Sequence, residues 1–161
     1  ERIWYGLITK LLIEVSDLPE IMKNGGYVKW LSAKNHTIRE DKKDRWKAGR
    51  KIDFFINCRQ KDMFRFAPVL PVVSTQKVEI TWKENVSSFK YLGLEFDRSC
   101  IIKIDNRFFG DVYLSYGKVI TSSYKLPELA MNDGFDTLED FLTYFNTDFK
   151  GKIIHWTDLK Y

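Results

Sequence analysis

The sequence predicts an α+β domain in which a small, curved antiparallel or mixed β-barrel carries short helices. Two observations predict this class. The middle of the chain is rich in aromatic and β-branched residues that alternate with polar ones, which is typical of half-buried strands. The helical patterns come late, and one strand-like segment follows them. Strands first, helices later and a returning strand favour an α+β arrangement over repeated βαβ units.

Size and composition indicate one domain over residues 1–161. The chain has 161 residues, 44% hydrophobic and 16% aromatic, which is enough to fill one core. No run of about 18 apolar residues is present, and the first residues resemble neither a signal peptide nor a transit sequence. We therefore expect a cytoplasmic protein with no membrane partner.

The segment before residue 32 gives mixed signals. Its two short apolar runs, 3–8 and 11–15, fit a strand or a helix equally well. Asp17, with Pro19 close behind it, predicts the start of a short helix that Gly25 and Gly26 would end.

The central strands are predicted from their aromatic and β-branched content. They cover residues 52–58, 64–67, 69–82, 100–104 and 112–114. Pro68 and Pro71 cannot donate to a central ladder, so they mark an edge, a bulge or a corner. Asp105 and Asn106 predict a turn between the last two of these strands.

The acidic C-terminal region predicts two helices. Residues 126–130 fit a short helix that Gly134 ends. Asp136 can cap the next helix, and Glu139 completes a capping box with it. The apolar stripe of this helix predicts core packing and consists of Leu138, Phe141, Leu142 and Phe145. Residues 151–157 form the last predicted strand.

Two cysteines and two histidines offer no metal-ligand spacing, so we expect no metal and no cofactor. Cys58 and Cys100 lie in apolar, strand-like stretches and are predicted to be buried free thiols. His36 and His155 are predicted to be structural histidines with satisfied hydrogen bonds. The aromatic residues expected in the core are Trp82, Trp156, Phe64 and Phe66.

Charge is unevenly distributed along the chain. Residues 34–51 carry eight cations and three anions, a net charge of +5, whereas residues 126–149 carry six acids and no base. A basic segment favours a phosphate-bearing partner, because such contacts release counterions. The alternative is a solvated loop whose charges only keep the protein soluble.

The basic segment begins with the pattern Lys34-x-x-Thr37-x-Arg39. In an extended chain Thr37 and Arg39 share one face, and the two residues His36 and Ile38 take the other. Lys34 joins Thr37 only if the chain turns before the strand. An amine, a hydroxyl and a guanidinium would then surround one small hollow. The alternative is an ordinary surface strand.

This pattern, followed by residues 46–52, resembles the signature of the ASCH domain family in the PUA-like superfamily. Segments 129–135, 138–145 and 151–156 resemble the later helices and the closing strand of that family. The match is poor before residue 17 and across about 83–120, where the chain is expected to carry an insertion. The resemblance implies a PUA-like β-pseudobarrel with flanking short helices, and a bacterial or phage setting.

The resemblance also implies a cleft that binds RNA, a nucleotide or a modified nucleoside. Arg39 is suited to a phosphate or a base carbonyl, unless it forms an ion pair with Asp133 at the barrel rim. Trp46 is suited to stacking on a base, or else closes the end of the barrel. The basic residues expected around them are Arg45, Lys47 and Arg50.

One enzymatic branch of the family removes the acetyl group from N4-acetylcytidine with a Lys, a Thr and a Glu. These positions fall on Lys34, Thr37 and Asp133, where Asp is one methylene shorter than Glu. Thr37 would attack the amide carbonyl, Lys34 would move its proton, and Asp133 would orient the pair. Lys34 would then need a pKa lowered from about 10.4 to about 7, which a neighbouring carboxylate opposes.

Three functions therefore stand as alternatives. The first is an RNA- or nucleotide-binding domain, and the second is an amidohydrolase acting on acylated nucleosides. The third is a protein-interaction or regulatory domain with a vestigial cleft.

Overall fold

The computed structural model describes residue 3 and residues 33–84, 96–115 and 118–161. The strands are β1 (His36–Arg39), β2 (Lys51–Ile56), β3 (Phe64–Pro71), β4 (Ser74–Glu84), β5 (Arg98–Ile104), β6 (Arg107–Ser115), β7 (Lys118–Thr121) and β8 (Phe149–His155), and the helices are α3 (Lys125–Asp133) and α4 (Leu138–Tyr144). Six strands form one sheet in the order β1-β8-β4-β5-β6-β7, and β2 and β3 form a separate hairpin.

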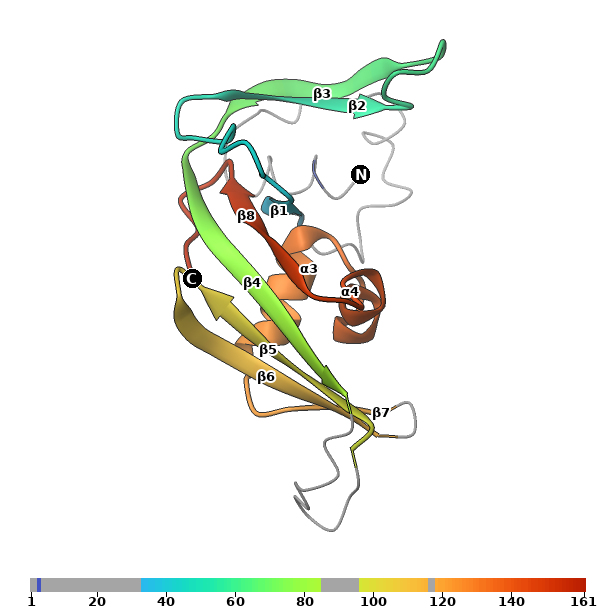
Figure 1. The fold of residues 1–161 in the computed structure, drawn as a ribbon. Coiled ribbons are helices and arrows are strands. Elements are labelled where there is room, and N and C mark those ends of the chain that lie inside the picture. Colours follow the sequence, from blue (N-terminus) through green and yellow to red (C-terminus); the bar gives the residue numbers. More distant parts are fainter. Residues whose placement is uncertain (1–2, 4–32, 85–95, 116–117) are drawn as a thin grey trace.

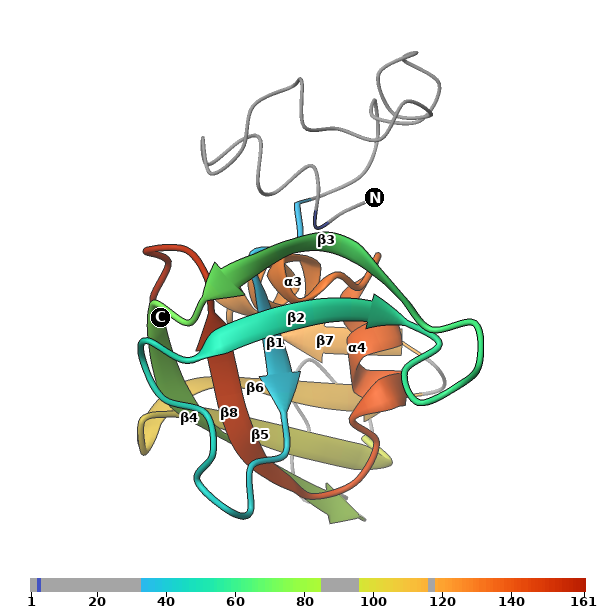
Figure 2. The same ribbon diagram turned by 90° about the horizontal axis from the view of Figure 1, so that it is seen from above.

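The main sheet curves into a half-barrel, and the two short helices pack on one of its faces (Figure 1). Seen from above, the β2–β3 hairpin crosses over the end of the sheet where β1 and β8 lie (Figure 2). All neighbouring strands pair in the antiparallel direction. The predicted α+β class with an antiparallel, barrel-like sheet is therefore confirmed.

Strand β8 separates two hydrophobic cores. Ile153 and Ile154 are consecutive and both are buried, but strand side chains alternate between the two faces of a sheet. Ile153 packs with α3, α4 and the inner positions of β4 and β5. Ile154 packs with Trp156 and with hairpin residues such as Ile52. The hairpin therefore covers the face of β8 opposite to the helices.

The predicted strands are found, with one correction. Residues 69–82 are not one strand, because β3 ends at Pro71 and β4 begins at Ser74. Between them, the buried Val72 donates its N–H to the Arg50 carbonyl and accepts from the Gly49 N–H, at 2.6 and 2.8 Å. These two bonds hold the passage from the hairpin to the sheet. Pro68 lies on β3, whose ladder partner is β2, as expected for a proline on an edge strand.

The two predicted helices are also found. Helix α3 is capped at its C-terminus by Gly134, as predicted, and this glycine has a left-handed φ of 94°. Helix α4 begins one residue later than expected, because its N-cap is Thr137 and not Asp136. The Thr137 hydroxyl accepts the Asp140 N–H at 3.1 Å. The predicted turn at Asp105 and Asn106 is present, with φ of 50° and 64°.

The segment expected to be an insertion, about 83–120, supplies strands β5, β6 and β7 to the main sheet within its described part. The elements expected before residue 32 lie outside the described residues, apart from Ile3. In the part of the chain that the structure describes, no helix is long and apolar enough to cross a membrane.

The two cysteines differ in their surroundings. Cys100 is buried as predicted, and burial raises the pKa of its thiol to about 12. Cys58 is exposed, so its prediction was wrong. It follows the end of β2, between Asn57 and Arg59, whose positive φ values of 52° and 68° form the hairpin turn. The apolar pattern of β2 does not extend into this turn.

Candidate functional site

A cleft of about 620 Å³ lies between the β2–β3 hairpin and β1. Its described lining combines aromatic rings with cations. The aromatic residues are Trp46, Phe54, Phe55, Phe66 and Trp156. The charged residues are the four cations Lys34, Arg39, Arg45 and Arg59 and the two acids Glu40 and Asp53. The described part of the lining is therefore both aromatic and net positive.

The predicted site residues fall into two groups. Those that line the cleft are Lys34, Thr37, Arg39, Arg45 and Trp46. The other three are absent from its described lining. Asp133 contacts Lys34, Lys47 forms an exposed ion pair with Asp44 at 3.2 Å, and Arg50 closes a backbone turn onto the Lys47 carbonyl.

Strand β1 presents its residues as the alternation predicts. His36 and Ile38 are buried on one face, while the half-buried Thr37 and the exposed Arg39 lie on the other. The ion pair considered between Arg39 and Asp133 is not among the described contacts, in which the Asp133 carboxylate meets Lys34 and His36. Arg39 instead lines the cleft.

Lys34 and Asp133 come together although 99 positions separate them in the sequence. The Lys34 ammonium lies 3.4 Å from the Asp133 Oδ1 and also donates to the Asp133 backbone carbonyl. The same Oδ1 accepts the N–H of Ile38 at 2.8 Å. Gly134 makes this approach feasible, because a Cβ at that position would lie 3.0 Å from the Lys34 Cδ. Asp133, only 6% exposed, therefore ties α3 to β1 and holds the lysine.

Behind Asp133 lies a group of buried polar side chains. His36 is bonded through Nε2 to the Tyr161 hydroxyl at 2.9 Å, and its Nδ1 lies 3.5 Å from Asp133. Burial lowers the pKa of His36. The pKa of His155 is lowered to about 3, mainly by burial and to a smaller extent by the charge of the neighbouring His36. Among the described residues neither ring nitrogen of His155 has a hydrogen-bond partner. The prediction of satisfied bonds was therefore wrong for His155, whose ring packs against the rings of His36 and Tyr161.

The loop after β1 is fixed by Lys152 of β8. The Asp41 carboxylate accepts the N–H groups of Arg45 and Trp46, at 2.8 and 2.9 Å. The Lys152 ammonium lies 3.1 Å from Asp41 and donates to the Trp46 carbonyl at 2.7 Å. Burial acts against the charge of Lys152, but its bonds to Asp44 and Asp41 outweigh burial and raise its pKa.

This fixed loop presents a stacked pair to the cleft. The Arg45 guanidinium lies over the Trp46 ring, 5.1 Å from its centroid. Such a cation–π contact orients the charge without consuming its hydrogen-bond donors.

Several lining residues were not predicted as site residues. Phe54, Phe55 and Arg59 come from the hairpin and its turn, and Trp156 and Phe66 were expected only in the core. Trp156 is buried as predicted, but Phe64 is 53% exposed, so its core prediction was wrong. A two-stranded hairpin buries one face only, which leaves residues of its other face exposed. The alternation within β2 was the available signal, but it does not reveal which sheet the hairpin covers.

Among the described residues, no group of three His, Cys, Asp or Glu side chains is placed to hold a metal ion. No protein-family model, curated protein or solved structure matches this chain.

Proposed function

We propose that the chain is an RNA- or nucleotide-binding domain of the PUA-like, ASCH type, which holds a nucleotide unit in the cleft under the hairpin. The observation that carries this proposal is the presence of aromatic rings and arginines in one cleft. A nucleotide has a flat base and an anionic phosphate, so it needs both kinds of contact.

Each part of the nucleotide has a suitable partner. Stacking of a base on an aromatic ring contributes about 1 to 3 kcal/mol, and Trp46 lies at the cleft with its backbone fixed. Arginine binds phosphate oxygens through two parallel N–H groups. Arg39, Arg45 and Arg59 all line the cleft, so the phosphate has several donors within the same cleft.

Hydrolysis of an acylated nucleoside is supported less well than binding. Thr37 and Lys34 line the same cleft, as an amidohydrolase requires. However, the Lys34 nitrogen donates to the Asp133 carbonyl and lies beside its carboxylate, and both acceptors stabilise the ammonium form. An ammonium cannot take the proton of Thr37, so this geometry favours a lysine that positions or binds over one that acts as a base.

A titration with mononucleotides tests the proposal. UMP, CMP, AMP and GMP are added to the full chain while tryptophan fluorescence is recorded, because Trp46 and Trp156 line the cleft. We expect saturable binding that Trp46→Ala weakens by about tenfold or more, which corresponds to the loss of one stacking contact. Arg39→Gln should also weaken it, whereas Arg107→Gln, on β6 outside the cleft, serves as the matched control.

This titration and a separate assay of acetate release distinguish the three alternatives. Acetate release from N4-acetylcytidine that stops in a folded Thr37→Ala variant would favour the hydrolase. Absence of binding by all four nucleotides would overturn the proposal and favour an interaction domain.

A further inference from the structure

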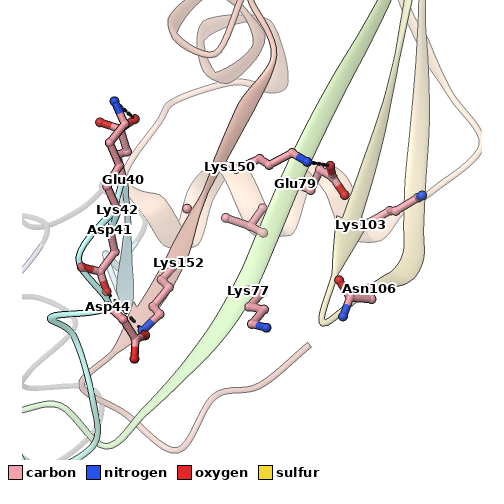
Figure 3. Close-up of a pocket in the computed structure, with 12 residues that line it drawn as sticks. Glu40, Asp41, Lys42, Asp44, Lys77, Glu79, Lys103, Asn106, Lys150 and Lys152 are labelled. Atoms are coloured by element: carbon pink, nitrogen blue, oxygen red, sulfur yellow. Dashed lines mark hydrogen bonds and ion pairs between the residues drawn. The ribbon is translucent and has the colours of Figure 1, made fainter.

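A second hollow, of about 450 Å³, lies on the open outer face of the main sheet, where β8, β4 and β5 run side by side (Figure 3). It is on the opposite face from the helices, because Lys152 and Lys150 alternate with the inward-facing Ile153 and Gly151. Its charged lining consists of the lysines 42, 77, 103, 150 and 152 and the acids Glu40, Asp41, Asp44 and Glu79.

Each acid of this hollow has a lysine partner. Glu40 pairs with Lys42 at 3.0 Å, and Glu79 pairs with Lys150 at 2.7 Å. Asp41 and Asp44 pair with Lys152, and Asp44 also pairs with Lys47. The bond from Lys150 is the largest cause of the lowered pKa of Glu79, so this acid stays ionised. The four carboxylates are thus neutralised locally.

Two lysines of the hollow remain without an ion pair among the described residues, namely Lys77 of β4 and Lys103 of β5. Figure 3 shows their side chains extending from the sheet, whereas Lys150 is joined to Glu79. Lys103 lies opposite Glu79, two positions along from Lys77. The two are therefore diagonal neighbours, with Cα atoms about 7 to 8 Å apart. They offer two adjacent ammonium groups without a bonded carboxylate partner among the described residues, although Lys103 also acts on Glu79 across the ladder and helps to lower its pKa.

The hollow and the cleft meet at the loop after β1. Glu40 lines both, and a smaller hollow of about 220 Å³ between them is lined by residues 40–43 and Arg45. Lys42 and Lys43 lie on this loop. Cations thus occur in all three hollows, from Arg39 and Arg45 in the cleft to the two lysines on the sheet. The acids of the loop that lie among them are paired with lysines.

We propose that this outer face binds the sugar-phosphate backbone of a single-stranded polynucleotide, with Lys77 and Lys103 contacting phosphates beyond the nucleotide held in the cleft. The inference rests on the proposed function. It makes the ligand a strand and not a free mononucleotide. A single strand fits because a base must be unstacked to enter a cleft, and a charged groove that follows the backbone is the usual complement to such a base site.

The test compares a strand with a mononucleotide in the full chain. Fluorescence anisotropy is measured with an oligouridylate and an oligothymidylate of about twelve nucleotides, at several salt concentrations. In the variant Lys77→Gln/Lys103→Gln we expect the affinity for the strand to fall about fivefold to tenfold, as two exposed ionic contacts are lost. The slope of log K against log salt should decrease by about 1.4. Binding of UMP should not change.

A charge-matched control is Lys118→Gln/Lys125→Gln, which removes two cations from β7 and α3. If this control lowers the affinity and the salt slope as much as the first variant, only net charge matters and the inference is overturned. If the strand binds but neither variant differs from the parent protein, the inference is overturned while UMP binding still supports the cleft. If the first variant alone weakens the strand and UMP does not bind, the outer face stands and the cleft proposal fails. The ribo and deoxyribo strands distinguish RNA from single-stranded DNA as the source.

Discussion

Two histidine rings, His36 and His155, lie against each other inside the protein, with centroids 5.4 Å apart and no exposed surface. Both are neutral in the folded chain near neutral pH, because burial lowers their pKa. In the unfolded chain they take up protons below the ordinary value of 6.5. The unfolded state therefore binds more protons than the folded one in mildly acidic solution. These residues make the protein less stable as the pH is lowered.

We expect His155→Leu to reduce this acid sensitivity. The pKa of His155 is about 3 in the fold against an ordinary 6.5, so its contribution is lost between those two values as pH falls. The loss is about 1.4 kcal/mol per pH unit for one proton. Urea unfolding of both proteins at about pH 8, 6, 5 and 4 measures it, and the value at about pH 8 isolates the change in packing. Equal pH slopes for both proteins would contradict the prediction.

Among the elements, α4 shows that a local sequence pattern predicts a helix but not the residue at which it begins. The chain contains two overlapping capping patterns, Asp136-x-x-Glu139 and Thr137-x-x-Asp140. Both predict a helix, and the apolar stripe from Leu138 to Phe145 is buried in the helix that forms. Sequence alone does not choose between caps one residue apart. In the structure the Thr137 hydroxyl accepts the Asp140 N–H at 3.1 Å, so the second pattern is the one that forms.

We expect Thr137→Ala to destabilise the protein by about 1 kcal/mol, because the Asp140 N–H at the start of α4 loses its acceptor. Asp136→Ala, one position earlier, is the matched control and should have a smaller effect. Urea denaturation followed by circular dichroism measures both free energies of unfolding. A larger effect for Asp136→Ala would mean that the helix begins where the sequence pattern first placed it.

In the site, the features that depend on local sequence could be predicted, and those that depend on contacts between distant segments could not. The alternation of Thr37 and Arg39 against His36 and Ile38 is local and was predicted. The contact between Lys34 and Asp133 could be predicted only from a family resemblance, since nothing local links residues so far apart. The hairpin aromatics of the cleft were missed because their role depends on β2–β3 folding over β8, a contact between distant segments. Local periodicity specifies faces, not the partners that cover them.

Considered as a whole, the molecule is organised around β8, which has the helices on one face and the hairpin on the other. The candidate cleft belongs to the hairpin side, and its described lining includes Ile154 but not Ile153. Polar residues on the hairpin side then continue down the sheet as the lysine-bearing outer face. One strand thus contributes to the main core, to the cleft and to the outer face.

Substitutions of Ile153 and Ile154 distinguish the helix side of β8 from its hairpin side. Ile153→Ala and Ile154→Ala each remove a fully buried side chain, so each should destabilise the fold by about 2 to 5 kcal/mol. Only Ile154→Ala enlarges the cleft, so it alone should weaken UMP binding in the folded protein. Urea unfolding gives the stabilities and tryptophan fluorescence the affinities, and Ile154→Val provides a milder change that keeps the fold. If Ile153→Ala weakened binding as much as Ile154→Ala, the cleft would depend on the stability of the whole sheet and not on the side that the hairpin covers.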